Sequence, residues 1–387
     1  MRVLILGGGY AGVMAANRLA ARDDERMSVV LVNARPYFVE RIRLHEVAAG
    51  SRHDARLDFT EILHPNVEVL VGTAEHIVTD DRVVQGSSAT GPWSQAYDRL
   101  VYAVGSAVPA ADATVQLSTE EGAAQTYERL TQLPDAATVT VVGGGLTGIE
   151  AAAEIASVRG DLNTRLISAG LIGAALSERG RHSVLRALQR RRIDTAEQQR
   201  VTSVRPGGLT TDGSGYLDSD LILWSGGFAA PDLAARSGLP VDELGRLRVD
   251  RELRCIEDQT IFGAGDSVVT PLEHLRMSCA AAMPQGAHVA DTITADLEAK
   301  QSSELSLGFV GQCIYLGKGS GVIQLVRRDD RPRKLVLSGK TGSWINEQVN
   351  NYTVTSMRRE RRRAGAYKWL AGPPQKHHPV TADHDHR

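Results

Sequence analysis

The feature that most constrains this chain is a glycine-rich turn that occurs twice, 136 residues apart. Residues 3–12 read VLILGGGYAG, residues 139–148 read VTVVGGGLTG, and eight of nineteen positions match when 2–20 is laid over 138–156. Each copy has a short apolar strand, a G-x-G-x-x-G turn and an Ala-rich helix start, in that order. In such a turn the first glycine allows a tight bend, the second lets a pyrophosphate approach, and the third lets the helix pack closely on the strand. The two copies predict two dinucleotide sites in one α/β chain, and hence electron transfer between two cofactors.

The glycines of these turns have defined roles. They are Gly7, Gly9 and Gly12 in the first copy and Gly143, Gly145 and Gly148 in the second. The helix start offers unpaired N–H groups and the positive end of the helix dipole to a phosphate. A glycine-rich connection that binds nothing is the simpler alternative. It is less favoured because a second apolar strand follows each turn, at residues 29–32 and 165–167, as in dinucleotide-binding units.

The residue that ends each second strand normally meets the adenosine ribose, about 20 residues past the last glycine. Here these residues are Asn33 and Ser168, so both copies lack the usual acid. The amide oxygen of Asn33 can accept a hydrogen bond from a ribose hydroxyl. Ser168 neither repels a 2′-phosphate nor is followed directly by an arginine, and Arg179 or Arg181 reaches this position only if the intervening loop folds back. The sequence leaves the choice between NADH and NADPH open.

Length, charge and cysteine content narrow the class of protein. At 387 residues the chain is long enough for two or three domains. A net charge of −2 gives no general attraction to nucleic acid, and no such partner is expected. The first turn begins near the start of the sequence and no apolar run reaches the ~18–20 residues of a membrane span, so we expect a cytoplasmic protein without a signal peptide. Cys255, Cys279 and Cys313 form no close pair, which argues against a redox disulfide.

The pattern along the chain predicts an α/β fold with two Rossmann-like dinucleotide-binding domains and a small C-terminal α+β region. The expected domains are a discontinuous first unit at 1–107 and 250–300, a second unit at 108–249, a C-terminal domain at 301–372 and a disordered tail at 373–387. Further elements are expected as a strand and glycine turn at 97–106, a helix at 119–133, a strand at 221–224, an Ala-rich helix at 278–299 and β-type alternation at 305–345. We assign no metal site, because the histidines of the tail have no fixed geometry.

With these motifs the chain resembles the flavoproteins of the glutathione-reductase fold, which bind two dinucleotides, over residues 1–345. Three more segments carry the similarity: Leu100–Ser106 is similar to the A-T-G turn of that family, Ile261–Asp266 to its second flavin motif, and Leu239–Asp250 to the stretch before that motif. The resemblance implies that the first turn binds FAD and the second binds NADH or NADPH. It also implies that Asp266 hydrogen-bonds the ribityl or pyrophosphate region of FAD. A helix N-cap is a second role open to Asp266.

The residues assigned to the two cofactor sites follow from the turns and from this resemblance. For FAD they are Gly7, Gly9, Tyr10, Ala11, Gly12, Asn33, Arg41, Gly105, Gly265 and Asp266. For NAD(P)H they are Gly143, Gly145, Gly148, Ser168 and Gly227. No side-chain nucleophile is required, because hydride transfer from nicotinamide to flavin is chemistry of the cofactors.

Within the superfamily the chain is most similar to type II NADH dehydrogenases and apoptosis-inducing-factor-like reductases, which lack the redox disulfide. The segment Ile149–Glu154 matches their helix. The resemblance places Glu154 near the isoalloxazine, where a carboxylate acts as a catalytic group by influencing proton uptake. The alternative is that Glu154 is an exposed helix acid.

Two segments depart from the type II pattern, and both would line the acceptor side of the flavin. Arg41–Leu44 carries Ile42 in place of a proline, and Cys279–Ala280 replaces an Ala-Gln pair, although Gln285-Gly286 is kept. Arginines there disfavour a long-tailed quinone. Arg41 or Arg43 either stabilises the anionic reduced flavin or a polar acceptor, or is a surface side chain.

The C-terminal region is basic. Residues 327–370 hold twelve Lys/Arg against four Asp/Glu, with a focus at Arg358–Arg363. Such a segment with aromatic neighbours can rest on an anionic membrane surface. One expectation is therefore peripheral contact with the inner face of a membrane, and the other is a solvated helix or a homodimer contact.

These observations predict an FAD-dependent NAD(P)H dehydrogenase that passes electrons to a quinone or another small-molecule acceptor. Two alternatives stay open. One is a reductase of a ferredoxin-type protein, because the basic region suits an acidic electron-transfer partner. The other is a redox- or nucleotide-sensing flavoprotein with little turnover.

Overall fold

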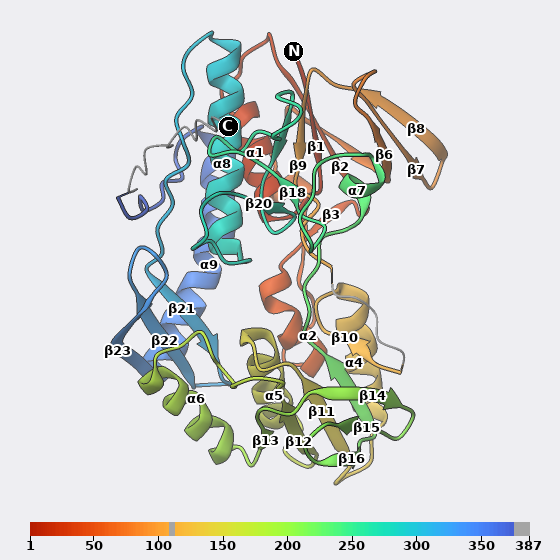
Figure 1. Cartoon of the computed structure of the whole chain (residues 1–387), viewed down its shortest axis with the longest axis vertical. Helices are drawn as coiled ribbons and strands as arrows, with labels where there is room; N and C mark the ends of the chain where they lie inside the picture. Colours follow the sequence, from red (N-terminus) through yellow and green to blue (C-terminus); the bar gives the residue numbers. More distant parts are fainter. Residues whose placement is uncertain (108–112, 375–387) are drawn as a thin grey trace, which may run out of the picture.

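The computed structural model describes residues 1–107 and 113–374. Two parallel five-stranded sheets lie toward opposite ends of its long axis (Figure 1). The first has the strand order β19-β9-β1-β2-β5 and the second has the order β10-β17-β11-β12-β13. In both, the strand before the glycine turn is central, and the next strand of the unit lies on one side of it, as in a doubly wound dinucleotide-binding fold. The predicted α/β class with two Rossmann-like domains is confirmed.

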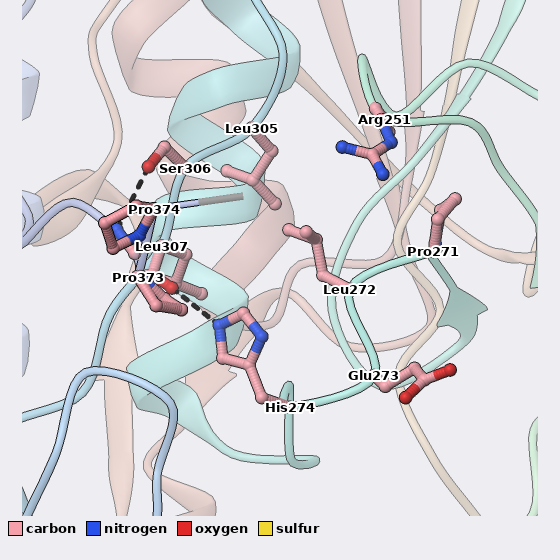
Figure 2. Close-up of a pocket in the computed structure, with 11 residues that line it drawn as sticks. Arg251, Pro271, Leu272, Glu273, His274, Leu305, Ser306, Leu307, Pro373 and Pro374 are labelled. Carbon is pink, nitrogen blue, oxygen red and sulfur yellow. Dashed lines mark hydrogen bonds between the residues drawn. The ribbon is translucent and has the colours of Figure 1, made fainter. Parts of the chain in front are cut away.

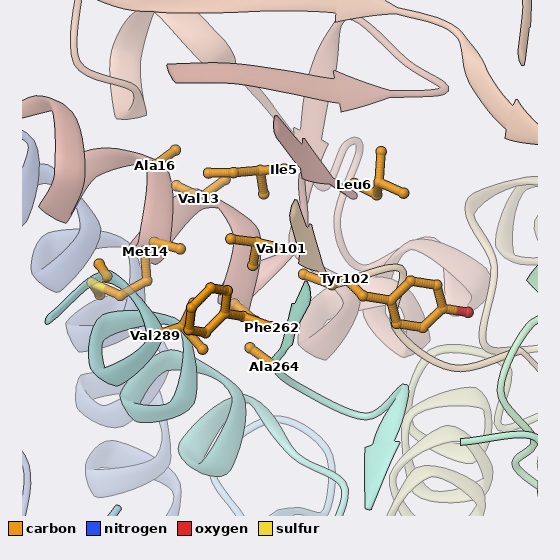
Figure 3. Packing of buried hydrophobic residues seen from close by; sticks show 14 of the residues in the cluster. Ile5, Leu6, Val13, Met14, Ala16, Val101, Tyr102, Phe262, Ala264 and Val289 are labelled. Carbon is orange, nitrogen blue, oxygen red and sulfur yellow. The ribbon is translucent and has the colours of Figure 1, made fainter. Parts of the chain in front are cut away.

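The first sheet is buried on both faces. Its strands are β1 (Arg2–Leu6), β2 (Ser28–Asn33), β5 (Val67–Val71), β9 (Arg99–Tyr102) and β19 (Ile261–Gly263). Helices α1 (Tyr10–Ala20) and α8 (Cys279–Leu297) pack against each other. Figure 3 shows how Met14 of α1, Phe262 of β19 and Val289 of α8 meet in this core. Because β1 is buried from Val3 to Leu6, it reads as a continuous apolar run rather than an alternating one.

The second sheet repeats this plan. Its strands are β10 (Val115–Gln116), β11 (Thr138–Val142), β12 (Asn163–Ile167), β13 (Asp194–Ala196) and β17 (Leu221–Trp224). Its helices are α4 (Glu120–Gln132), α5 (Leu146–Val158) and α6 (Glu178–Arg190). Thr119 Oγ1 accepts a hydrogen bond from Gly122 N at 3.0 Å and so caps α4. The helix predicted at 119–133 is confirmed.

The C-terminal region is a three-stranded antiparallel sheet and one long helix, which confirms the predicted α+β character. The elements are β21 (Gly311–Tyr315), β22 (Gly321–Val326), β23 (Pro332–Gly339) and α9 (Lys340–Arg362). Helix α9 packs on this sheet and also on α1. Gln324 of β22 accepts a hydrogen bond from Ser177 N at 3.1 Å, at the start of α6. The C-terminal region therefore contacts both dinucleotide-binding units.

Shorter elements connect these parts. They are the 3-10 helix η1 (Arg41–Arg43), the helices α2 (Leu44–Ala49), α3 (Phe59–Ile62) and α7 (Leu233–Arg236), and the strands β3 (Tyr37–Val39), β4 (Arg56–Asp58), β6 (Thr73–Val78), β7 (Val83–Ser88), β8 (Gly91–Ala96), β14 (Val201–Arg205), β15 (Gly208–Thr211), β16 (Gly215–Asp218), β18 (Leu247–Arg248) and β20 (Val268–Val269). Helix α2 packs on both α4 and α5, so it joins the first unit to the second (Figure 1).

The division of the chain into domains stays a prediction, and core packing bears on one of its limits. Leu233, Leu239 and Leu247 are buried in the core of the first sheet, although the sequence pattern grouped 108–249 with the second. This packing favours a return to the first unit soon after β17. Residues 375–387 of the predicted tail lie outside the described part of the chain.

Candidate functional site

The first glycine turn leaves open space at the start of α1. Gly7 has a φ of +101°, and a Cβ there would lie 2.3 Å from the carbonyl oxygen of Ala103. A Cβ at Gly12 would lie 1.9 Å from the carbonyl oxygen of Gly7, so neither position accepts a side chain. A Cβ at Gly9, in contrast, would meet no described atom within 4 Å. The open side of the turn faces the N–H groups at the start of the helix, which suits a pyrophosphate.

The second glycine turn has the same geometry. Gly143 has a φ of +130°, and a Cβ there would lie 2.5 Å from Oγ of Ser225. A Cβ at Gly148 would lie 2.0 Å from the carbonyl oxygen of Gly143, and one at Gly145 would meet no described atom within 4 Å. Gly227 follows β17 with a φ of +76° and equally open surroundings. Both turns thus fit the pyrophosphate of a dinucleotide.

Asn33 and Ser168, which end the second strand of each unit, form different hydrogen bonds. Asn33 Oδ1 accepts a hydrogen bond from Gly8 N at 2.9 Å, and its Nδ2 donates to the carbonyl oxygen of Arg35 at 2.8 Å. Asn33 therefore holds the turn itself and keeps one lone pair of its amide oxygen for a ribose hydroxyl. Ser168 Oγ instead accepts from Gly170 N at 3.3 Å, inside its own loop.

Asp266 lies in a partly buried group of polar side chains beside the first turn. Ser106 Oγ donates a hydrogen bond to Asp266 Oδ2 at 3.1 Å, and Arg41 Nη1 donates to the carbonyl oxygen of Ser106 at 3.1 Å. Burial raises the pKa of Asp266, while the hydrogen bond from Ser106 and the charge of Arg41 oppose that rise. A hydrogen bond from the backbone of Ser278, just before α8, acts in the same direction. Asp266 therefore interacts with the start of α8, but the N-cap residue of that helix is Ser278, so the alternative role of Asp266 as an N-cap is wrong.

Gly265 and Gly286 allow close packing around Ala11. A Cβ at Gly265, where φ is +85°, would lie 3.2 Å from Cβ of Ala11, and one at Gly286 would lie 2.1 Å from the carbonyl oxygen of Ala11. Gly265 N donates a hydrogen bond to Oε1 of Gln285 at 2.8 Å. The Gln-Gly pair that the sequence keeps thus fixes the strand end that carries Asp266.

Arg43 is buried and Arg41 is half-buried, so the expectation of a surface side chain is wrong for Arg43. Burial lowers the pKa of Arg41, and the charge of Asp266 opposes that shift. Arg43 is 3% exposed and forms ion pairs of 2.8 Å with Glu46 and 2.7 Å with Glu347 of α9. Arg43 therefore links α9 to the first unit, whereas Arg41 remains near Asp266.

Another residue predicted for the FAD site, Tyr10, contacts the core. Its aromatic ring packs edge-on against Phe38, with centroids 5.0 Å apart.

Two carboxylates follow the second turn at the contact between α5 and β21. Glu150 Oε1 accepts a hydrogen bond from Tyr315 N at 2.9 Å, and burial raises the pKa of Glu150 to about 8. Glu154 is 2% exposed, which makes the alternative of an exposed helix acid wrong. Burial raises the pKa of Glu154, while hydrogen bonds from Ser51 and Tyr315 oppose the rise. The catalytic role of Glu154 stays a prediction.

Cys279 and Cys313 are far apart in sequence but close enough in space to interact electrostatically. All three thiols are free. Burial, followed by the charge of Asp266, raises the pKa of Cys279 to about 11. Burial, followed by the charges of Glu150 and Cys279, raises the pKa of Cys313 to about 12. Neither thiol is therefore activated as a thiolate at neutral pH.

Two cavities border the loop between β20 and α8. One, of about 260 Å³, is lined by Gly265, Asp266 and Gln285 together with residues of that loop. The other, of about 280 Å³, lies between the loop and Pro374, where His274 Nε2 is 2.9 Å from the carbonyl oxygen of Leu307 (Figure 2). Only the first cavity contains predicted site residues.

Comparison with known proteins places this site in a family. Residues 1–286 match the model of the pyridine nucleotide-disulphide oxidoreductases. The chain is 30% identical to an NADH dehydrogenase-like protein of Mycobacterium tuberculosis, over 91% of this chain and 94% of that protein. It is 28% identical to a demethylphylloquinone reductase of Synechocystis, over 68% and 71%. The sulfide:quinone oxidoreductase of Aquifex aeolicus has the same fold, with a TM-score of 0.78, 19% identity and coverage of 93% and 92%.

The chain belongs to the pyridine nucleotide-disulphide oxidoreductase family. It is an oxidoreductase with FAD as cofactor and NADH or NADPH as substrate, as predicted. The residues around the two turns fit these dinucleotides, since the open sides at Gly9 and Gly145 are where pyrophosphates approach. The assignment of individual residues to each cofactor stays a prediction.

Sequence reasoning missed several members of the site. Ser106 was seen only as the end of a turn, yet it links Arg41 to Asp266. Tyr315 was placed in a β-type stretch without a role, yet it contacts both carboxylates of α5. Glu197, which follows β13 and accepts a hydrogen bond from Ile172 N at 2.6 Å near the second turn, was not singled out at all. Its position at the carboxyl end of a parallel strand, where ligands of such sheets bind, is the signal that could have found it.

Proposed function

We propose that this oxidoreductase is a type II-like NAD(P)H dehydrogenase that transfers electrons from the nicotinamide nucleotide, through FAD, to a quinone. The observation that carries the proposal is the pair of glycine turns of equal geometry in one chain. The quinone follows from relatives named as quinone reductases, such as the demethylphylloquinone reductase. When bound, the cofactors supply hydride transfer from nicotinamide to flavin.

The residues of the chain bind and orient these groups. The turn at Gly7–Gly12 would hold FAD together with Asp266 and its neighbours Ser106 and Arg41. The turn at Gly143–Gly148 would hold the nicotinamide nucleotide. Arg41 is half-buried near Asp266 and would place a positive charge close to the flavin, where it favours an anionic form. Glu154 would hold or release a proton at the contact between α5 and β21.

The residues expected on the acceptor side of the flavin favour a quinone that binds through its polar head group. Arg41 and Cys279 both interact electrostatically with Asp266, so this side is not a purely apolar slot. We therefore expect short-chain quinones to be reduced faster than quinones with a long apolar tail.

An acceptor screen tests the proposal. The purified FAD-bound protein is mixed with NADH or NADPH and, in separate assays, with a short-chain quinone, a ferredoxin-type protein or dioxygen alone. Turnover with the quinone that exceeds the other two by at least tenfold is expected. Turnover only with the iron–sulfur protein, or flavin reduction without turnover with any acceptor, would contradict a quinone reductase.

We also propose peripheral contact with a membrane through the outer side of α9. Trp344 and Tyr352 are 65% and 49% exposed, and helical spacing places Arg359 and Arg362 on the same side. Aromatic side chains next to arginines suit an anionic membrane surface. No helix among the described residues is long and apolar enough to cross a membrane.

Vesicle flotation tests this contact. The protein should float with vesicles that contain anionic lipid and remain behind with zwitterionic ones. A variant with Trp344→Glu and Tyr352→Glu should lose flotation while it keeps NAD(P)H oxidation with a short-chain quinone. Equal flotation of the variant would rule out this face.

A further inference from the structure

The second glycine turn is covered by the loop that follows β12. Gly173 N donates a hydrogen bond to the carbonyl oxygen of Gly144 at 2.8 Å. A Cβ at Gly144 would lie 2.3 Å from Oγ of Ser168 and 3.2 Å from Cα of Ile172. The loop 168–173 therefore lies directly against the turn, at the place where the adenosine ribose of a dinucleotide is read in such units.

Glu197 holds this loop in place. It follows β13, the neighbour of β12, and the carboxyl ends of parallel strands lie along one edge of the sheet. Ser168 N donates to the carbonyl oxygen of Ala196 at 2.8 Å, and Gln199 N donates to the carbonyl oxygen of Ser168 at 2.9 Å. Glu197 Oε1 accepts from Ile172 N at 2.6 Å. A carboxylate thus lies next to the ribose position although Ser168 itself carries none.

The same carboxylate engages Arg181. Its Oε2 forms an ion pair with Arg181 Nη2, and both side chains are 25% exposed. The segment between β12 and α6 folds back toward Ser168, which was the condition for an arginine to approach this position, and Arg181 does approach it. However, the positive charge of Arg181 is already matched by Glu197. Arg179, the other arginine considered for a 2′-phosphate, is exposed.

We propose that Glu197 makes the second turn select NADH over NADPH, in place of the missing acid at Ser168. A 2′-phosphate carries a charge of about −1.5 to −2 at neutral pH. It would have to compete with the carboxylate of Glu197 for Arg181, whose charge the ion pair already uses. A 2′-hydroxyl carries no charge and meets Ser168, which can donate or accept a hydrogen bond. The inference rests on the proposed use of the second turn as the nicotinamide nucleotide site.

The preference is measured as the ratio of kcat/KM for NADH to that for NADPH, with one quinone as acceptor. The wild-type ratio should be at least about 100, and Glu197→Gln should lower it by about tenfold or more, mainly through better use of NADPH, because tenfold corresponds to only about 1.4 kcal/mol. Glu178→Gln is the matched control, since Glu178 is an exposed acid near Arg181 in α6. It should leave the ratio unchanged.

Binding of nucleotide fragments provides a readout that is independent of turnover. By calorimetry the wild-type protein should bind 5′-ADP at least about tenfold more tightly than 2′,5′-ADP, and Glu197→Gln should narrow that difference. The double variant Glu197→Gln, Arg181→Gln should bind 2′,5′-ADP no more tightly than the wild type, because the arginine that could bind the 2′-phosphate is then absent.

Three outcomes would overturn the inference: a wild-type preference for NADPH or 2′,5′-ADP, an unchanged ratio in a folded Glu197→Gln protein, or an equal loss with both nucleotides. If Glu197→Gln does not fold, a wild-type preference for 2′,5′-ADP over 5′-ADP would still overturn the inference. Failure of the proposed function is a separate result, since neither NADH nor NADPH would then reduce the flavin.

Discussion

The two glycine turns share one backbone geometry but differ in what surrounds them. In both, the third glycine approaches the carbonyl oxygen of the first so closely that a Cβ would lie 1.9 or 2.0 Å from it. In the first copy, Asn33 then binds Gly8 N directly. In the second, the hydroxyl of Ser168 accepts a hydrogen bond from Gly170 N of its own loop, and Glu197, which follows the next strand, holds that loop. The shared part suits the pyrophosphate common to both dinucleotides, and the different part suits the groups that distinguish them.

The helices after the turns differ in the same way. Met14 of α1 is fully buried among apolar side chains, whereas the equivalent residue of α5 is Glu150. Arg18 of α1 is paired with Asp291 and Glu360, whereas its equivalent is the buried carboxyl of Glu154. The first helix is thus a core helix with a satisfied ion pair. The second carries two carboxyl groups whose pKa values burial raises.

Substitution of the third glycine of each turn should give the largest difference between the two turns in ligand binding. Gly12→Ala forces a Cβ against Gly7, and overpacking of about 1–3 kcal/mol should weaken FAD binding by about tenfold to 100-fold. Gly148→Ala should leave FAD bound and weaken NADH binding to a similar extent. Flavin content after purification and NADH titration measure the two effects. Loss of FAD from Gly148→Ala alone would reverse the assignment of the turns.

Substitution of the second glycine should affect ligands but not the fold. Gly9→Ala and Gly145→Ala add a Cβ that meets no described atom, so thermal unfolding without nucleotide should be unchanged. Binding of FAD by the first variant and of NADH by the second should weaken by about tenfold, because the added methyl group occupies the side that the pyrophosphate approaches. A large drop in the stability of the protein without nucleotide would show that these glycines serve packing instead.

The two strand-end residues should differ in their contribution to stability. Asn33→Ala leaves the buried N–H of Gly8 without its partner and should lower the free energy of unfolding by about 1–3 kcal/mol. Ser168→Ala removes only a long hydrogen bond and should cost less than about 1 kcal/mol. Urea denaturation of both variants tests the difference. Equal costs would mean that Asn33 does not hold its turn more firmly than Ser168.

Of the equivalent positions Met14 and Glu150 in the two helices, only Glu150 should contribute a pH effect to stability. Because burial raises the pKa of Glu150 to about 8, the folded state binds its proton more tightly than the unfolded chain does, whose pKa is about 4.3. The stability that this proton provides is complete at low pH and is lost as the pH rises from about 4.3 to about 8. Glu150→Gln should flatten this decline in urea denaturation, while Met14→Leu should keep it.

Local patterns predicted the fold well, because the interactions that define its elements lie close together in sequence. The glycine turns, the Thr119 cap and the apolar strands are all of this kind. The ion pair between Arg43 and Glu347 joins residues 304 positions apart, and no local pattern indicates it. The same holds for the link from Arg41 through Ser106 to Asp266, which requires three segments to meet.

The missed parts of the site share one physical reason. Glu197 and Tyr315 act through neighbours in the sheet or in another region, so their roles depend on strand order and domain packing. The packing of Leu233, Leu239 and Leu247 into the first core is a similar case. A sequence pattern marks such residues as strand ends or core positions without identifying the element that they contact.

We infer that the first turn holds FAD and that the second binds the nicotinamide nucleotide that reduces it. Anaerobic mixing of the FAD-bound protein with one equivalent of NADH tests this most directly. The visible absorbance of oxidised flavin should be lost rapidly in the wild type and at least about tenfold more slowly in Gly145→Ala at the same subsaturating NADH, with FAD retained in both. A flavin that neither NADH nor NADPH reduces, or one that the two proteins reduce at the same rate, would contradict the account.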